Sequence, residues 1–218
     1  MKIVDISRPL TNDLAPWPGD TAFRFGLSWK MAEGASVNVG AINMSLHNGT
    51  HADAPFHFEQ NGFSIDRMPL DHYVGPAVVV DLTKRFEKAA DQTGNGEIQI
   101  ADLAPCSDSL RRAQRLLLKT NVWMNSTVFP GWIPVVARGV PEWLRDHQVK
   151  LLGLDLPSVD PIDAKKLTNH YALNQAGIAI LESLDLTQVR EGIYHLAALP
   201  LKVAGGDAGP VRAILWQD

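Results

Sequence analysis

Eight short apolar runs constrain the fold of this chain more than any other feature of its sequence. Each is rich in Val, Ile and Leu and is bounded by Gly, Pro or Asp, a composition typical of β-strands rather than helices. The runs cover residues 2–7, 37–46, 77–82, 115–120, 150–156, 178–184, 193–203 and 211–216. This pattern predicts a β-rich domain, and the periodicity leaves the order of its strands open.

Fewer segments carry helix signals. They are residues 100–106, the basic stretch that leads into the run at 115, residues 140–149 with Pro141 in the first turn, and residues 164–177, which close on Gly177. Together with the strands, they predict an α/β fold class that is rich in β-structure. No repeat, low-complexity tract or linker interrupts the chain, so we expect residues 1–218 to form a single domain with a substantial core.

Charge and cysteine content exclude several classes of function. The formal net charge is −4 and no run of Lys or Arg is long, so neither nucleic acid nor a membrane surface is an expected partner. The N-terminus lacks the apolar segment of a signal peptide, and no stretch is apolar enough to span a bilayer, so we expect a cytoplasmic protein. The lone Cys106 has no partner for an internal disulfide and is expected to be a bystander thiol.

A cluster of histidines stands in "LHNGTHADAPFHFEQ", residues 46–60. Three of the 7 histidines in the chain, His47, His51 and His57, lie in this window together with Asp53. An Asn-Gly pair and a following proline make a helix unfavourable here. On an extended chain, residues two apart point the same way, so these four odd-numbered side chains are expected to converge. Imidazole and carboxylate suit zinc and related metals, and three protein ligands plus water form an open, catalytic site.

The alternative interpretation is that these residues only line a core. Isolated histidines are usually packed or exposed without a special role, and we interpret His72, His147 and His195 in this way. Three histidines and an aspartate on one face are different, because burying them without a metal would leave several polar groups competing for partners. The cluster therefore favours metal binding.

The pattern His-x-Gly-Thr-His-x-Asp-x-Pro-x-His resembles the signature of the cyclase-like metal-dependent hydrolase family. The likeness extends over nearly the whole chain, through "DISRPL", "PWPGD", "LDHYVGP", "GLDLPSVDP", "NHYALNQAGIAILESLDL" and "YHLAALPLKVAGGDAGPVRAIL". Within the family, the chain is most similar to the kynurenine formamidase (arylformamidase) branch. This resemblance implies a swivelling β/β/α architecture.

The resemblance also implies a site with two divalent metal ions per subunit, zinc or alternatively manganese. One ion would be held by His47, His51 and Asp53, and the second by His170. Glu182 would be shared between the ions, and Asp53 would also bridge them. His57 would transfer protons and Trp17 would contact the substrate. Five donors exceed one tetrahedral site with a water position, but they suit two bridged ions.

The activity implied is hydrolysis of an aryl formamide, N-formyl-L-kynurenine, to L-kynurenine and formate in tryptophan catabolism. Alternatives are the opening of a cyclic amide, as in isatin hydrolase, cleavage of another aryl amide, or a non-catalytic protein that binds metal or a small molecule. His57 and Trp17 favour catalysis, because a purely structural metal site needs neither. The sequence contains no Gly-x-Ser-x-Gly elbow, so a formamidase of the serine-hydrolase type is not expected. It also contains no Gly-x-Gly-x-x-Gly dinucleotide loop, so a nicotinamide or flavin cofactor is not indicated.

Several positions depart from the pattern of the formamidase branch. Thr50 stands where Ala is common, Leu156 where Thr is common, and residues 205–210, "GGDAGP", where text like "ADASP" is common. We expect none of them to touch the proposed ligands. The loop 205–210 is expected to be a plain turn, with an anion-binding nest as the alternative. Asp155 and Asp160 are expected to be structural turn residues.

Members of this family commonly form homodimers or larger homo-oligomers with subunit contacts near the pocket. In the 121–132 segment, Trp123, Phe129 and Trp132 could cover a partner surface or cap the protein's own pocket. The sequence leaves these two possibilities open.

Overall fold

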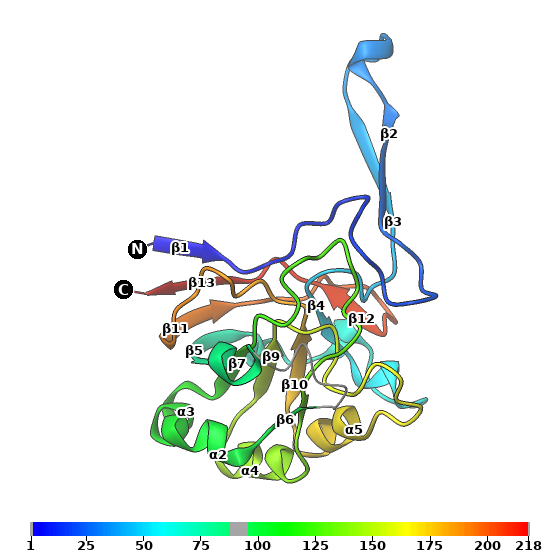
Figure 1. Cartoon of the computed structure of the whole chain (residues 1–218). Coiled ribbons are helices and arrows are strands. Elements are labelled where there is room, and N and C mark those ends of the chain that lie inside the picture. Colours follow the sequence, from blue (N-terminus) through cyan, green and yellow to red (C-terminus); the bar gives the residue numbers. More distant parts are fainter. Residues whose placement is uncertain (1, 88–95, 218) are drawn as a thin grey trace.

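The computed structural model describes residues 2–87 and 96–217, and across these residues a nine-stranded mixed sheet forms the centre of the molecule (Figure 1). Neighbours in the segment from β5 to β10 are parallel, and the remaining neighbours are antiparallel. In order across the sheet, the strands are β1 (Lys2–Asp5), β13 (Ile214–Gln217), β11 (Gly192–Ala197), β5 (Val74–Asp81), β7 (Arg115–Lys119), β9 (Leu151–Leu154), β10 (Ala179–Glu182), β4 (His51–Asp53) and β12 (Ala208–Pro210).

Short helices cover one face of this sheet, with α2, α3 and α4 along its lower edge in Figure 1. The α-helices in the described ranges are α1 (Thr83–Phe86), α2 (Ile100–Leu103), α3 (Ser107–Ala113), α4 (Val140–Asp146) and α5 (Thr168–Gln175). Single 3-10 turns are η1 (Met31–Glu33), η2 (Pro55–His57), η3 (Ile65–Arg67), η4 (Leu70–His72) and η6 (Ala104–Cys106). None of the helices within residues 2–87 and 96–217 is both long and apolar enough to cross a membrane.

The parallel strands are buried on both faces, which explains their continuous apolar runs. In β7, Leu116 and Leu118 pack in the cluster that contains Leu110 of α3 and Leu144 of α4. Leu117 points the other way, into a second cluster on the opposite face. The sheet therefore separates two cores, and side chains from both of its antiparallel ends pack in the second.

A β-hairpin projects from the body of the molecule (Figure 1). Strands β2 (Arg24–Trp29) and β3 (Val39–Asn43) pair antiparallel, and η1 lies at the tip. We call residues 24–43 the arm. Its strands are exposed throughout, including the side chains of Phe25, Trp29 and Ile42. A further pair, β6 (Glu97–Ile98) and β8 (Val135–Val136), forms a small parallel sheet beside the helices.

The mixed α/β, β-rich fold class predicted from the sequence is confirmed. Each of the eight apolar runs overlaps a strand, and α4 and α5 lie within two of the predicted helical segments. The described residues contain more strands than there are apolar runs, because β2, β4, β6, β8 and β12 were not among the runs. Four of these strands have only two or three residues, and β2 lies in the arm, where no buried face imposes an apolar pattern.

Candidate metal centre and active site

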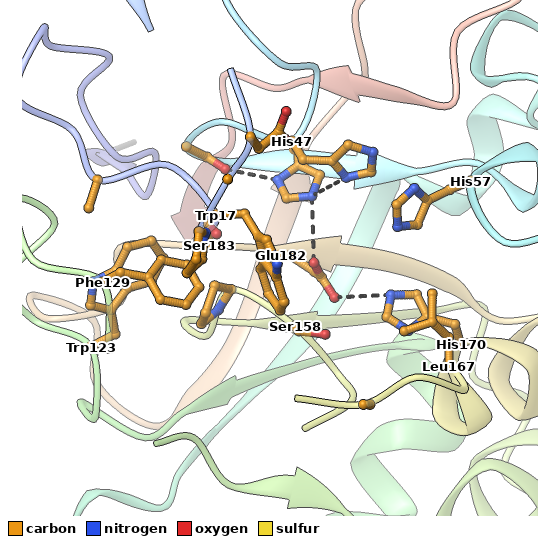
Figure 2. A pocket seen from close by; sticks show the side chains of 18 residues that line it. Trp17, His47, His57, Trp123, Phe129, Ser158, Leu167, His170, Glu182 and Ser183 are labelled. Atoms are coloured by element: carbon orange, nitrogen blue, oxygen red, sulfur yellow. Dashed lines mark hydrogen bonds and ion pairs between the residues drawn. The ribbon is translucent and has the colours of Figure 1, made fainter. Parts of the chain in front are cut away.

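The centre of the candidate site lies where β4 pairs with β10. His51 and Glu182 are directly opposite each other in the antiparallel register. Paired residues on neighbouring strands share a face, and Asp53 is two residues further along β4 on that same face. Sheet pairing therefore brings together one imidazole and two carboxylates, all buried. Figure 2 shows the Glu182 carboxylate joined by dashed lines to the ring of His170 on one side and, on the other, to the imidazole that is His51.

The tautomer of His51 is fixed by the turn before the strand. Its Nδ1 lies 2.9 Å from the carbonyl oxygen of Gly49, which accepts the hydrogen bond. Gly49 has a φ of +66°, a left-handed conformation that favours glycine. With the proton on Nδ1, a neutral His51 ring has its lone pair on Nε2, the atom that lies 3.3 Å from Asp53 Oδ1 and 3.5 Å from Glu182 Oε2.

His47 and His57 flank the strand rather than lie on it. Only residues 51–53 are extended, since His47 stands in the preceding turn and His57 in η2. The prediction that an extended path aligns all four side chains was therefore wrong in its backbone geometry. The side chains converge nonetheless. His47 Nδ1 is 3.1 Å from His51 Nε2 and 3.2 Å from Asp53 Oδ1, and the rings of His47 and His57 are 4.1 Å apart.

His170 reaches the site from the first turns of α5. Its Nδ1 lies 2.6 Å from Asp160 Oδ2, while the backbone N–H groups of Asn169 and His170 also donate to the Asp160 carboxylate. The opposite ring nitrogen, Nε2, faces Asp53 Oδ2 at 3.3 Å and Glu182 Oε1 at 3.6 Å. Asp160 was expected to be only a turn residue. That expectation was incomplete, because its carboxylate orients the His170 ring.

Within the residues that the structure describes, two groups of donor atoms in this site meet the spacing of a metal site, with all ligand atoms of a group within 4.8 Å of one another. One group is His47, His51 and Asp53, and the other is Asp53, His170 and Glu182. Asp53 belongs to both. Both of its carboxylate oxygens are buried, and neither has an aligned hydrogen-bond donor.

An ionised carboxylate that is buried without aligned hydrogen bonds is costly unless positive charge lies beside it, and a cation between Asp53 and the surrounding nitrogens supplies that charge. Imidazole nitrogen and carboxylate oxygen are ligands that zinc accepts. The residues present therefore fit a pair of divalent ions that share the Asp53 carboxylate.

The electrostatics of the site lead to the same conclusion. Burial alone would lower the pKa of His51, but the carboxylates of Asp53 and Glu182 outweigh it and raise that pKa to about 10. Burial also opposes protonation of His170, and Asp160 and Asp53 raise its pKa to about 10. The two buried carboxylates thus favour positive charge beside them. Metal ions supply that charge when they bind and displace the protons from the histidines.

His57 behaves in the opposite way. Burial is the largest influence on it and lowers its pKa. Its ring is therefore neutral near pH 7 and free to accept a proton. It lines the same pocket as the donor groups and has a side chain that is 31% exposed. This is the position and protonation state that a general base requires.

A third group joins His47 and His57 to Asp207, which no sequence interpretation singled out. Asp207 Oδ2 lies 3.0 Å from His47 Nε2 and 3.7 Å from His57 Nδ1. The expectation that the 205–210 loop is a plain turn, remote from the ligands, was therefore wrong. Asp207 precedes β12, and only the pairing of β12 with β4 brings it to the histidines. No local sequence signal could have identified it.

A pocket of about 510 Å³ opens onto these groups. Its polar end holds the histidines and Glu182, and its other end is walled by aromatic side chains (Figure 2). Trp17 packs edge-on against Phe129 with ring centres 5.2 Å apart, and Phe129 contacts Trp123 at 5.8 Å. Two of the three aromatic residues noted in the 121–132 segment thus cap the protein's own pocket. Trp132 instead packs against the helix-side core beside Phe86.

The aromatic wall is anchored by Arg8. Its guanidinium lies 4.0 Å from the centre of the Trp123 ring and donates to the backbone oxygens of Trp123 and Asp155. Asp155 in turn accepts hydrogen bonds from the backbone N–H groups of Thr120 and Asn121. This matches the structural turn role expected for Asp155.

The residues that the sequence analysis set aside lie outside this pocket. Burial raises the pKa of Cys106 to about 11, so its thiol is a poor nucleophile. His195 stacks on Trp216, and the Nδ1 of His147 lies 2.8 Å from the carbonyl oxygen of Trp143. Neither histidine, nor His72, lines the pocket.

Donor atoms of three histidines and two carboxylates at the end of an aromatic pocket, with His57 beside them, are the arrangement that metal-dependent hydrolysis requires. The model of the Cyclase family matches residues 4–161, and the chain belongs to this family.

Two relatives that are similar to the chain over nearly its full length are kynurenine formamidases. The chain is 43% identical to the kynurenine formamidase of Geobacillus thermodenitrificans over 212 residues, which cover 97% of this chain and 96% of that protein. It is 41% identical, with the same coverage, to the kynurenine formamidase of Bacillus thuringiensis subsp. konkukian. The chain is thus a hydrolase similar to kynurenine formamidases over nearly its full length.

Solved structures agree with the assignment of the chain to a family of hydrolases. A structure described as a potential metal-dependent hydrolase with cyclase activity superposes with a TM-score of 0.77 at 27% identity, covering 98% of this chain and 96% of the other. Isatin hydrolase A from Labrenzia aggregata gives a TM-score of 0.77 at 26% identity, covering 98% of this chain and 93% of the other.

Proposed function

We propose that residues 1–218 act as one hydrolase domain that cleaves an aryl formamide, N-formyl-L-kynurenine, to L-kynurenine and formate. Two divalent ions per subunit, zinc or alternatively manganese, would be held by His47, His51, Asp53, His170 and Glu182. The observation that carries the proposal is the pair of donor groups that share Asp53 beside an aromatic pocket. The kynurenine formamidase relatives support the choice of substrate.

When bound, such ions supply Lewis acidity, which lowers the pKa of water and polarises a carbonyl. The remaining chemistry belongs to the chain itself. His57, neutral near pH 7, takes a proton from the attacking water and delivers it to the departing nitrogen. The water oxygen first forms the new C–O bond to the formyl carbon, and the C–N bond then breaks as the nitrogen leaves with the proton from His57. Because an aryl ring stabilises the nitrogen lone pair of the leaving amine, modest acid catalysis is sufficient.

The pocket walls suit the proposed aromatic substrate. Trp17, Phe129 and Trp123 offer flat apolar surfaces at the end away from the donor groups. A ring packed there would place a substituent at the polar end, next to His57. The volume of about 510 Å³ is in the range of sites for small molecules.

A cyclic amide is the second candidate substrate. The observation in its favour is the structural likeness to isatin hydrolase A. The same donors and the same proton transfer would open a lactam ring, so only substrate selectivity separates the two proposals.

The decisive experiment combines elemental analysis of the purified protein with turnover of N-formylkynurenine, other aryl formamides and isatin. We expect about two divalent ions per chain, highest kcat/KM for N-formylkynurenine, loss of turnover with a chelator and recovery when zinc is restored. Equal turnover before and after metal removal would refute the metal-dependent mechanism. Highest kcat/KM for isatin would favour the cyclic amide. Metal binding without turnover of any substrate would indicate a non-catalytic binding protein.

We further propose that the protein functions in the cytoplasm as a homodimer or larger homo-oligomer, in which the arm supplies much of the interface. Unpaired apolar side chains on a projecting hairpin are unfavourable in water, and burial against a second copy removes that cost. The exposed apolar residues of the arm are Phe25, Leu27, Trp29, Met31, Val37, Val39 and Ile42. The loop that leads into the arm contains Trp17 and Asp20 of the pocket wall, so subunit contacts would lie near the site.

A further inference from the structure

We propose that Asp207 is a positioning residue that sets the tautomer of His47 and the orientation of His57. This inference rests on the proposed function, because it gives Asp207 its importance through two histidines of that site. Asp207 itself is not proposed as a metal ligand or as a group that contacts the substrate.

The backbone of Asp207 is firmly placed. Its carbonyl oxygen accepts a hydrogen bond of 2.9 Å from the N–H of Ala54, directly after β4. The next residue, Ala208, pairs with Asp53 in the sheet. Gly205, on the other side of the loop, donates its N–H to the Asp66 carboxylate at 3.0 Å. The Asp207 side chain is therefore held against the strand that carries His51 and Asp53.

Its contact with His47 determines which ring nitrogen carries the proton. An ionised carboxylate only accepts hydrogen bonds, so at 3.0 Å from Asp207 Oδ2 the Nε2 of His47 must be the N–H donor. The neutral ring then has its lone pair on Nδ1, the atom that faces His51 Nε2 at 3.1 Å and Asp53 Oδ1 at 3.2 Å. A carboxylate that fixes the tautomer of a metal-binding histidine in this way raises its metal affinity.

The contact with His57 involves the same oxygen. Asp207 Oδ2 is 3.7 Å from His57 Nδ1, too long for a hydrogen bond but close enough to favour the neutral tautomer that has its N–H on Nδ1. The rings of His47 and His57 also pack together at 4.1 Å. One carboxylate therefore restrains two adjacent imidazoles, and the nitrogen of His57 away from Asp207 is left for proton transfer.

The test compares Asp207→Asn with Asp207→Ala. Asn has almost the same shape as Asp, but its amide N–H can donate to His47 Nε2 and so favour the wrong tautomer. If Asp207 acts as proposed, Asn does not rescue the site. Both variants then lower kcat by about 10- to 100-fold, with KM little changed, and weaken zinc binding by about the same factor in a chelator competition. A third readout is the ¹⁵N spectrum of the imidazoles in metal-free protein at neutral pH, where we expect the His47 signals to change in both variants.

Asp146→Asn, an exposed change in α4, is the matched control and should leave every readout unchanged. If Asp207→Asn retains the kcat, zinc affinity and ¹⁵N spectrum of the parent while Asp207→Ala does not, the role of Asp207 is packing and the inference is overturned. Such a result leaves the proposed function intact, because the parent protein would still bind zinc and turn over substrate. Failure of the parent in those two assays would overturn the proposed function instead.

Discussion

Glu182 of β10 lies directly opposite His51 of β4, and Glu182 Oε2 is 3.5 Å from His51 Nε2. The site is thus assembled on rigid sheet, from two strands whose residues are 131 positions apart in sequence. Val159 donates its backbone N–H to Glu182 Oε1 at 3.0 Å, which fixes the carboxylate further. Preorganisation of this kind holds ligands in place before a metal arrives.

Replacement of His57 by alanine should abolish most activity without loss of metal. General acid–base catalysis contributes about 10²- to 10⁴-fold, so kcat should fall by that factor. Metal content, measured by elemental analysis, should remain near that of the parent, because His57 is absent from both donor groups that share Asp53. Loss of metal in the variant would instead identify His57 as a ligand.

Metal-free protein should lose stability as the pH rises from about 6.5 to about 10. The pKa values of His51 and His170 are raised from 6.5 to about 10 in the folded state, so folding is favoured by the protons they hold. That stability is fully present below pH 6.5 and is lost as the pH passes through about 10. Tm measured across this range should fall in chelator-treated protein and change much less after zinc is restored. A flat profile in the metal-free protein would contradict the arrangement of charges described here.

Metal affinity should show the reverse dependence on pH. Each ion must displace protons from His51 or His170, so zinc binding should strengthen as the pH rises towards 10 and weaken in acid. Zinc competition with a chelator of known pH behaviour, between pH 6 and 9, measures the trend. Affinity that is independent of pH would mean that these imidazoles are not ligands.

Removal of the Trp17 ring should weaken binding of aromatic substrates. Burial of an aromatic face contributes about 1.5–3 kcal/mol, so Trp17→Ala should raise KM for an aryl formamide on the order of 10-fold or more. Turnover of a small alkyl formamide is the control, because it does not reach the aromatic wall. An equal effect on both substrates would show that the change disturbs the donor groups rather than the wall.

Charge on the arm should disrupt assembly. Phe25 and Ile42 are directly paired across β2 and β3 and are 50% and 61% exposed. Phe25→Asp combined with Ile42→Asp should shift the mass measured by light scattering to that of the monomer. The control is Ser28→Asp, which adds a charge on the same hairpin without removing apolar surface. A parent protein that is already monomeric would refute the oligomer proposal.

The sequence by itself determined the parts of this protein that depend on neighbours in the chain. Apolar runs such as "RLLLK" specify buried strands because both faces of the sheet are covered. The spacing in residues 47–57 places imidazole and carboxylate donors close together, in one turn and one strand. His170 and Glu182 were predicted only through the family resemblance, since nothing in their local sequence marks them as donors.

The tertiary structure decided what depends on pairing between distant strands. Asp207 is 160 residues from His47 and reaches it through the pairing of β12 with β4. Asp160 orients His170 because α5 packs beside it. Trp123 and Phe129 line the pocket because Arg8 anchors the Trp123 ring. Local composition does not predict such contacts, because the free energy that stabilises them comes from packing and charge across the folded domain.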